Sequence, residues 1–511
     1  MRLPCPERVS LWPVFWFAAV LAGLQIYEGT APLFALGSFF FILVAAVGFN
    51  VAGGFTRPSG SYIFFFSVLG VIIGLTWKAV LGEPADSNLA VPTITITVYL
   101  CGICGLLVAA YISKKLTTRR ALLADFVTDD NMQNATVGCM AVGLILTLVL
   151  MFVPHGGSGS VLSALNQLNH FLILSIFLGT LHTIRRSGGT RSVSLPILIS
   201  GTFLFFTGIL SFSKEGMITP FACWLFAAAS QRYKVSMAQI AGGLLGAFIL
   251  FQYLVPYSQY GRVYRADSFT EDVGVAFSLL GNLGYVREQF LESELEGEAD
   301  TNDELAQGYF NGHQGFFDRL QMIGPDDDLN ELTESGVVAG ITPVYMAFAN
   351  FVPHVIWPNK PTQGYGNIYA HQMGRLQDDD TTTGISFSPA GEAFHLMEWT
   401  GILILAPILW IGLFTLFDSL CGDVRNSPWG LLVVLVFSHY APEGGIGGII
   451  YLMGFLTLGI LFAAVTVTYL TPIVGEILIG PNKKKTIHFL NTVRNRPGRI
   501  HPIGSSQGIV N

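Results

Sequence analysis

Long apolar runs separated by short polar breaks dominate the chain. A helix needs about 20 mostly apolar residues to cross the hydrocarbon core of a bilayer. Runs of this kind predict twelve transmembrane helices, at 11–27, 31–52, 61–81, 90–112, 135–153, 162–184, 193–212, 216–230, 237–255, 399–421, 429–441 and 449–470. The runs 216–230 and 429–441 are short, which indicates tilted or broken helices that line a cavity.

The longest polar break predicts a large external loop domain. Within it, 274–291 and 336–352 have helical periodicity, and no stretch alternates well enough to predict a sheet. Acidic stretches such as 326–328 lack the spaced ligand order of a calcium loop, so we interpret them as a solvated, mobile face. The predicted organisation is nine membrane helices in residues 1–256, the external loop in 257–398, three membrane helices in 399–470 and a basic tail in 471–511.

Composition agrees with this pattern. Only 12% of the 511 residues are charged, 51% are hydrophobic, and the mean hydropathy is +0.54. A soluble domain has about twice that charge fraction, so a soluble globular enzyme and a disordered chain are both excluded. The net charge of -7 argues against nucleic acid as a partner. The predicted fold class is an all-α polytopic membrane protein.

Basic residues give an independent test of the span assignment. Cytoplasmic loops of membrane proteins are enriched in Lys and Arg. With both termini placed in the cytoplasm, 19 of the 27 basic residues fall in predicted cytoplasmic breaks or in the tail. The other eight lie on or near the outer side, where such residues are less expected without a function. They are Lys78, Lys214, Arg262, Arg265, Arg287, Arg319, Lys360 and Arg375.

Two groups of outer charges could bind a phosphate or diphosphate. Arg262 and Arg265 are spaced i and i+3 beside Tyr264, so their guanidiniums can point together at the outer headgroup level. An aromatic belt in which arginines meet lipid phosphates is the alternative. Lys214 and Glu215 lie in a tight hairpin between two apolar runs, where a charge pair is costly unless it faces water or a polar cavity. A pair that merely reaches the interface is the alternative.

Two further segments carry candidate chemistry. The run 351–361 holds His354, Trp357 and Lys360 among three prolines, which stiffen the backbone and suit the binding of a charged, sugar-bearing headgroup. A rigid interfacial loop is the alternative. Glu392 and His395, at i and i+3 before the tenth run, can share a helical face and act as a general base on a hydroxyl. The glycine-rich segment 438–448 is interpreted as a turn rather than a substrate contact.

The order of three pieces resembles a known family. They are SKEG at 213–216, VPHVIWPNKP at 352–361 and GISFSPAGEAFHLMEWTGI at 384–402. Together they resemble the bacterial O-antigen polymerases, the Wzy-type polymerases of lipid-linked oligosaccharide repeats. One departure is His354, which stands where that family usually has an arginine.

The resemblance implies a glycosyltransferase of the GT-C type in the bacterial inner membrane. It would join undecaprenyl-diphosphate-linked repeat units on the outer face, with membrane lipid and a chain-length regulator as further partners and with no metal or other cofactor. The diphosphate charge would be neutralised by Arg262, Arg265, Lys214 and Lys360, with His354, Trp357 and Tyr264 as further substrate contacts. Glu392 is the first candidate for the base, and His395 and Glu215 are the reserves.

Two alternatives from the sequence stay open. An O-antigen ligase would use the same lipid-linked donor but transfer the finished glycan to a lipid core. A polysaccharide or lipid transporter, such as a flippase, would also have twelve spans with broken helices. The chain shows no matching halves, and its large external domain has no role in transport, so the polymerase is preferred.

Overall fold

The computed structural model describes residues 1–124, 126–152, 165, 168–264, 269–300, 308–312, 314–352, 357, 360, 364–376, 379–381 and 383–480. The regular secondary structure of this part is helical, with two isolated bridges as its only β-type pairings. The first helices are α1 (Leu11–Tyr27), α2 (Pro32–Ala52), α3 (Pro58–Ser67), α4 (Ile73–Leu81), α5 (Pro92–Leu116), α6 (Met132–Phe152), α8 (Phe171–Arg186), α9 (Leu195–Leu210), α10 (Lys214–Ser230), α11 (Met237–Ile249) and α12 (Val255–Val263). The later ones are α13 (Phe269–Leu280), α14 (Leu283–Asp300), α15 (Ile323–Glu334), α16 (Thr342–Ala349), α17 (Tyr365–Gln372), α18 (Pro389–Thr400), α19 (Ala406–Cys421), α20 (Pro428–Glu443), α21 (Gly445–Tyr451), α22 (Thr457–Tyr469) and α23 (Thr471–Ile479).

Seven helical segments of the described chain are long and apolar enough to cross a membrane, and each coincides with a predicted run. They are Pro32–Ala52, Pro58–Leu81, Pro92–Leu116, Met132–Met151, Met237–Val263, Pro389–Asn426 and Gly445–Ile479. Helices α1, α8, α9, α10 and α20 occupy the remaining predicted runs, but each has only 16 or 17 residues. The α-helical membrane character is therefore confirmed, while twelve crossings remain a prediction.

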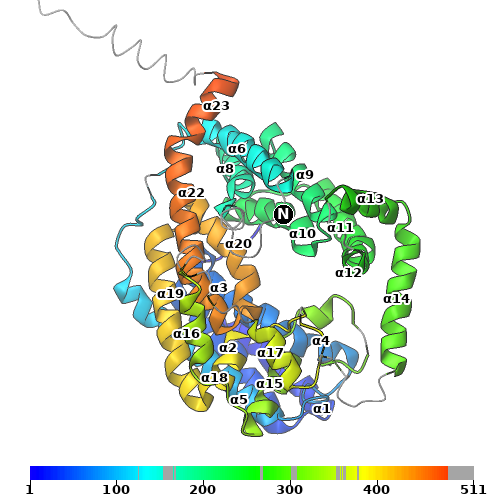
Figure 1. Ribbon diagram of the computed structural model, residues 1–511. Helices are drawn as coiled ribbons and strands as arrows, with labels where there is room; N and C mark the ends of the chain where they lie inside the picture. The colour runs from blue at the N-terminus through cyan, green and yellow to red at the C-terminus, as the bar shows by residue number, and fades with distance from the viewer. Residues whose placement is uncertain are drawn as a thin grey trace, which may run out of the picture.

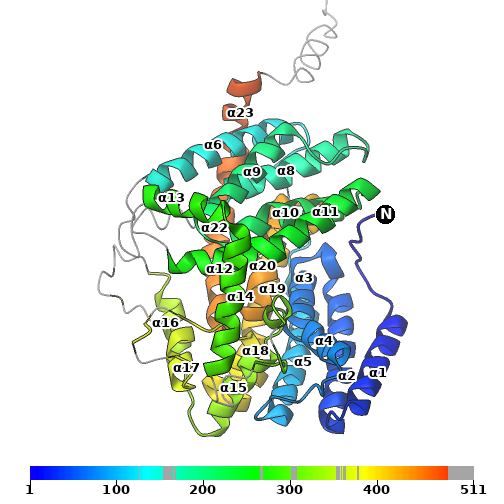
Figure 2. The same ribbon diagram turned by 90° about the vertical axis from the view of Figure 1, so that its right-hand side faces the viewer.

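Two groups of helices make up the body of the molecule. Helices α1, α2 and α5 pack with α18 and α19 and lie in the lower half of Figures 1 and 2. Helices α6, α8, α9 and α10 pack together in the upper half. Helix α20 contacts α3 as well as α8 and α10, and so joins the two groups. The last long helical segment runs to the top, where α23 packs on α6, so the helix extends past the predicted boundary at residue 470.

Proline sets the start of many helices, because its missing N–H leaves no donor unpaired in a first turn. It occupies the first or second position in α2, α3, α5, α9, α18 and α20. In α18 and α20 a serine precedes it and caps the helix, since Ser388 and Ser427 accept hydrogen bonds from Gly391 N and Gly430 N, both at 3.1 Å. Residues 389–396, predicted to belong to the external loop, thus form a short helix, which a kink with non-helical backbone at Met397 and Glu398 separates from the membrane span that follows.

The polar breaks contact one another in a way that follows the predicted topology. Leu3 N donates to Tyr233 O at 3.0 Å, which joins two breaks predicted to be cytoplasmic. Ala85 N donates to Thr30 Oγ1 at 2.7 Å, which joins two breaks predicted to be outside. Contacts of this kind place each group of breaks together, as alternating crossings require. Which side faces the cytoplasm stays a prediction.

The external loop contains short helices rather than one long surface element. The predicted helix at 274–291 is two helices, because Gly281 and Asn282 form a turn between α13 and α14. The predicted helix at 336–352 is only α16, which begins beside Pro343. Helix α15 packs on α18 and α5 and so anchors the loop to the membrane helices.

Asp326 forms the central contact of that anchor. Its carboxylate is 1% exposed and accepts hydrogen bonds from Tyr99 Oη at 2.6 Å, from Ser388 N at 2.9 Å and from Ser388 Oγ. Burial raises the pKa of Asp326 to about 6, although the hydrogen bonds from Ser388 and Tyr99 oppose that shift. The carboxylate therefore ties α15 to α5 and to the start of α18.

The two neighbouring aspartates complete the anchor. Asp327 accepts from Ala90 N at 2.5 Å and from Thr95 Oγ1 at 2.6 Å, at the start of α5. Asp328 pairs with Arg375 at 2.8 Å, just after α17. The interpretation of 326–328 as a solvated, mobile face was therefore wrong. The partners are hydroxyls, backbone amides and one arginine that lie far away in the sequence, so no local pattern could reveal them.

Candidate functional site

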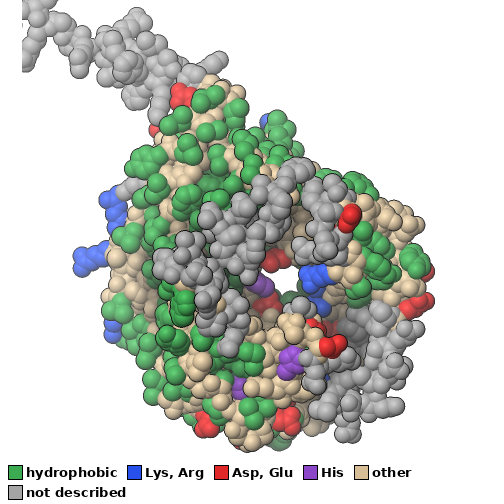
Figure 3. All heavy atoms as spheres, in the orientation of Figure 1, with side chains coloured by type: hydrophobic (Ala, Val, Ile, Leu, Met, Phe, Trp, Pro, Cys, Tyr) green, Lys and Arg blue, Asp and Glu red, His purple; other side chains and the backbone are tan. Residues whose placement is uncertain are grey.

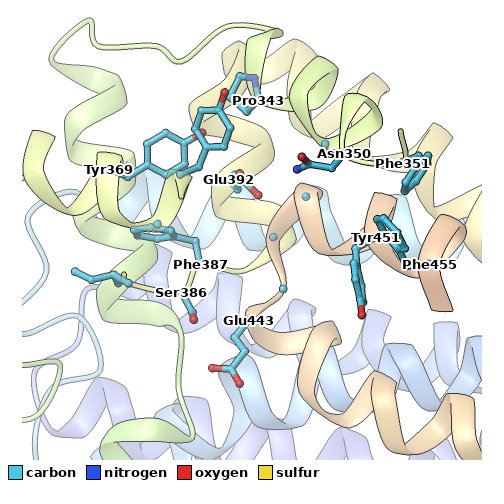
Figure 4. A pocket seen from close by; sticks show the side chains of 17 residues that line it. Pro343, Asn350, Phe351, Tyr369, Ser386, Phe387, Glu392, Glu443, Tyr451 and Phe455 are labelled. Atoms are coloured by element: carbon cyan, nitrogen blue, oxygen red, sulfur yellow. The ribbon is translucent and has the colours of Figure 1, made fainter. Parts of the chain in front are cut away.

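A cavity of about 330 Å³ lies where the external loop meets the membrane helices. Residues of α16, α17, α18 and the α20–α21 junction line it. Figure 4 shows Glu392 in the middle of the lining residues, with Tyr369 and Phe387 on one wall and Tyr451 and Phe455 on the opposite wall. The first-choice base from the sequence is therefore a cavity residue.

Glu392 is held in place from two directions. The Ser388 cap and the Asp326 contact fix the first turn of α18, on which Glu392 lies. Its side chain is 8% exposed, and Oε2 accepts a hydrogen bond from Ile446 N, at the start of α21. A buried carboxylate held by a backbone amide in a cavity can bind a substrate hydroxyl and receive its proton.

Gly445 makes the hydrogen bond between Ile446 N and Glu392 sterically possible. Its φ is +59°, a left-handed conformation that favours glycine. A Cβ atom at this position would lie 2.1 Å from Glu392 Oε2. The glycine-rich segment interpreted as a plain turn is thus the other half of the Glu392 site, and Glu443, Gly444, Gly445 and Gly447 all line the cavity.

Aromatic side chains give the cavity its shape. The rings of Phe351 and Phe455 are 5.5 Å apart on one side. On the other side Tyr369 is 2% exposed, and its hydroxyl has no hydrogen-bond partner among the described residues. Burial, followed by the charge of Glu392, raises the pKa of Tyr369, so the phenol stays protonated and can donate. Asn350 adds an amide that points into the same space in Figure 4. Aromatic faces with a few polar groups are typical of a small-molecule binding pocket.

A cluster of cations, formed by Lys214, Arg262 and Arg319, lies near this cavity. With the Gln259 amide turned so that its oxygen faces these donors, that oxygen accepts from Arg319 Nη2 at 2.7 Å and from Lys214 Nζ at 3.1 Å. Burial, then the charges of Arg319 and Arg262, lowers the pKa of Lys214 to about 8, and Glu443 opposes that shift. Three cations this close together are suited to a multiply charged anion.

The hairpin that carries Lys214 is built for close approach. Ser213 caps α10 by accepting from Gly216 N at 3.0 Å. A Cβ atom on Gly208 would lie 2.5 Å from the backbone of Gly216, so α9 and α10 cross in direct backbone contact. Arg262 Nε donates to Phe212 O at 3.3 Å and fixes α12 against the same hairpin. The structure thus brings Arg262 and the SKEG hairpin together, while their joint role in binding stays a prediction.

Glu443 connects the cavity to the cation cluster. It lines the cavity, and its Oε1 lies 2.7 Å from His439 Nδ1. Its negative charge also acts on Lys214, where it partly offsets the lowering of the pKa. Figure 3 shows a hollow on this face of the molecule, with basic side chains on one wall and acidic and histidine side chains opposite. An anion at the cluster and a neutral group in the cavity would therefore be close neighbours.

The two reserve bases lie elsewhere. His395 Nδ1 is 3.0 Å from Thr333 Oγ1, and its ring meets the edge of the Tyr369 ring at a centroid distance of 4.7 Å. It supports Tyr369 from behind and does not line the cavity. Glu215 is exposed on the first turn of α10 and is also outside the cavity lining. Glu392 and His395 were expected to act together on one helical face, but Glu392 faces the cavity and His395 faces Thr333 and Tyr369.

The proline-rich segment contributes less than the sequence suggested. Lys360 is 8% exposed, and its Nζ donates to Asn350 O at 3.2 Å and to Val352 O at 3.0 Å, after the end of α16. Its donors thus serve backbone carbonyls. Trp357 is 36% exposed, and Tyr264, 49% exposed, has its hydroxyl 3.0 Å from that of Tyr260. Two other predicted site residues, His354 and Arg265, lie outside the described residues.

Sequence reasoning missed Arg319, Tyr369 and Glu443 as site residues. Arg319 was noticed only as one of the outer cations, and its loop position gave no partner. Tyr369 lies in a segment without a recognisable motif. Glu443 follows an apolar run and precedes two glycines, a pattern that also fits an ordinary turn.

No group of three or more His, Cys, Asp or Glu residues is placed to hold a metal ion in the part of the chain that the structure describes. Comparison with family models, with curated proteins and with solved structures found no match to this chain.

Proposed function

We propose that the protein is a membrane glycosyltransferase that polymerises oligosaccharide repeat units carried on undecaprenyl diphosphate. The proposal is carried by one observation. A three-cation cluster and an aromatic cavity with a central carboxylate lie close together, and Glu443 connects them. Glycosyl transfer from a lipid diphosphate needs both parts, one for the leaving group and one for the acceptor. The proposed setting is the outer face of a bacterial inner membrane, with both termini in the cytoplasm.

The cation cluster would bind the diphosphate of the donor. Charge develops on the diphosphate as the bond to the anomeric carbon breaks, and fixed cations stabilise that charge. Lys214, Arg262 and Arg319 supply the stabilising positive charge without further rearrangement, because Gln259 and the α9–α10 hairpin already hold these side chains in place. Arg265, three residues after Arg262 in the sequence, lies outside the described residues and stays a predicted diphosphate contact. Lys360 is a weaker candidate, because backbone carbonyls already occupy its ammonium.

The cavity would hold the terminal sugar of the acceptor. A sugar ring would present C–H faces to Tyr369, Tyr451 and Phe455, and its hydroxyls could reach the Asn350 amide. Glu392 accepts the proton of the attacking hydroxyl, and that oxygen forms the new bond to the anomeric carbon. The bond from that carbon to the diphosphate breaks, and undecaprenyl diphosphate leaves with its electron pair.

Two substitutions test the assigned roles. Glu392→Gln keeps the size of the side chain but removes its basicity, so it should lower chain extension by about 100-fold or more. The control Glu398→Gln makes the same charge change at an exposed position of α18 and should leave extension unchanged. Normal extension by Glu392→Gln would eliminate the base assignment. If that variant fails to accumulate in the membrane, Glu392 instead has a structural role.

For the cation cluster, Arg319→Lys keeps the charge but loses the planar fork and should reduce extension about tenfold. Arg287→Lys, another outer cation that does not contact Gln259, serves as the control. Equal, mild effects at both positions would favour general lipid contacts over a diphosphate site.

The glycan profile of a deletion strain separates the polymerase from its rivals. Loss of a polymerase leaves a single repeat on the acceptor lipid. Loss of a ligase leaves none, and loss of a flippase keeps repeats from reaching the outer face. A profile of single repeats, restored to long chains by the wild-type protein, is the expected result.

A further inference from the structure

A second cavity, of about 600 Å³, lies at the opposite end of the α8–α9 pair from the Lys214 hairpin. It is formed by the first turns of α6, the last turns of α8 and the beginning of α9, on the predicted cytoplasmic side. Figure 2 shows these three helices together in the upper half. The cavity shares no lining residue with the Glu392 cavity, so it is a separate site.

The lining of this second cavity is basic and rich in hydroxyl groups. It includes the side chains of Arg186, Arg191 and His182, and none of its lining residues is acidic. Arg186 donates to Gln133 Oε1 at 3.0 Å, and no described carboxylate pairs with Arg186 or Arg191. Most donors of both guanidiniums are therefore available to a ligand. The hydroxyl groups of Thr183 and Ser194 also line the cavity, whereas those of Thr136, Ser187 and Thr190 donate to backbone carbonyls.

The adjacent arginine shows what a structural role looks like here. Arg185 pairs with Asp129 at 2.8 Å and donates to Arg425 O at 3.2 Å, so it joins α8 to two other breaks. Arg186 makes one such contact, with Gln133 on α6, and the Arg191 guanidinium has no hydrogen-bond or ion-pair partner among the described residues. General enrichment of cations in cytoplasmic loops explains their presence but not their convergence on one cavity.

His182 supplies an independent sign of a missing ligand. Its Nε2 atom is buried and has no hydrogen-bond partner among the described residues. A buried polar atom without a partner costs free energy, and it is usually satisfied by water or a ligand. His182 also lines the cavity, so the unpartnered nitrogen belongs to a cavity residue.

We propose that this cavity binds a phosphate group, that of an anionic phospholipid in the cytoplasmic leaflet. Two guanidiniums bind phosphate oxygens through paired hydrogen bonds, and an imidazole and hydroxyls satisfy the rest. Val137, Val193 and Pro196 add an apolar side to the lining. Leu195, which is 70% exposed beside them, continues that surface toward the acyl chains. The site does not depend on the proposed glycosyltransferase activity.

The test uses the full-length protein, purified in detergent and freed of lipid. Binding of short-chain phosphatidylglycerol, short-chain phosphatidylcholine and inorganic phosphate is measured by titration calorimetry. The variant Arg186→Gln/Arg191→Gln removes the two cations. The control Lys114→Gln/Arg119→Gln makes the same charge change at exposed positions of another predicted cytoplasmic break, outside the cavity.

Phosphatidylglycerol should bind tighter than phosphatidylcholine, should lose at least tenfold in affinity in the cavity variant and should change less than twofold in the control. If inorganic phosphate binds as tightly and is lost in the same variant, the site stands but its ligand is a free phosphate. Equal losses in the two variants would overturn the proposal. Should the double variant fail to fold, Arg191→Gln alone leaves the Arg186–Gln133 contact intact, and unchanged affinity there would overturn it as well.

Discussion

Replacement of Gly445 by alanine should break the hydrogen bond that Glu392 accepts from Ile446 N. An alanine at φ +59° costs about 1–2 kcal/mol for the left-handed backbone. The new methyl group would lie 2.1 Å from Glu392 Oε2, so the carboxylate must leave the Ile446 amide. Loss of a hydrogen bond to a charged group costs about 1.5–3 kcal/mol more. Gly445→Ala should therefore destabilise the folded protein by about 3–5 kcal/mol.

Gly447 offers a matched control. It also lines the cavity and lies two residues away in the same short helix, but a Cβ atom there would have no neighbour within 4 Å. Alanine in a helix is favoured over glycine by roughly 0.5–1 kcal/mol. Gly447→Ala should thus keep or slightly raise the stability of the protein.

The assay is the thermal unfolding midpoint of each purified variant in detergent, together with chain extension in cells. Gly445→Ala should lower the midpoint by several degrees, at roughly 2 °C per kcal/mol, and shorten the chains. Gly447→Ala should do neither. Wild-type stability and chain length in Gly445→Ala would refute the argument that this glycine positions Glu392.

Three further outcomes follow from the structure. Ser335→Cys should react with a membrane-impermeant thiol reagent in intact spheroplasts and Arg119→Cys should not, although both positions are exposed; the reverse pattern would overturn the topology. Donor binding should weaken as the pH rises through about 8, because Lys214 then loses its proton, and Lys214→Arg should remove that dependence in titrations from pH 7 to 9.5. The pKa of Asp326 is about 6 in the folded protein, above the ordinary value of 3.8, so its bound proton stabilises the fold at low pH and this contribution is lost as the pH rises through about 6. The wild-type melting midpoint should therefore fall more between pH 4.5 and 7 than that of Asp326→Asn.

The helices could be predicted because their signals are local. An apolar run of sufficient length, with proline at its start and glycine or a charge at its end, contains its own evidence. Helix α18 shows where this fails. Residues 389–396 carry an acid and a histidine, so they read as loop, yet the Asp326 contact and the Ser388 cap hold them as a short buried helix against α15, ahead of the kink at Met397 and Glu398. The contact that decides their state comes from 62 residues away.

The site was predictable in its parts but not in its assembly. Glu392 and the Lys214–Arg262 pairing could be proposed because charges beside membrane spans are costly and so attract attention. Arg319 and Glu443 could not, because their role depends on the packing of α10, α12 and α20 around one hollow. Lys360 shows the opposite case, a residue whose charge suggested a binding role but whose ammonium donates to backbone carbonyls.

Reconstitution tests the central claim most directly. The purified protein is placed in liposomes with undecaprenyl-diphosphate-linked repeat units as the only substrate, and the products are separated by chain length. The account predicts a ladder of longer lipid-linked glycans, one molecule of undecaprenyl diphosphate released for each bond formed, and no ladder with Glu392→Gln. Repeats that cross the bilayer without lengthening, or that are transferred only to an added lipid core, would contradict it.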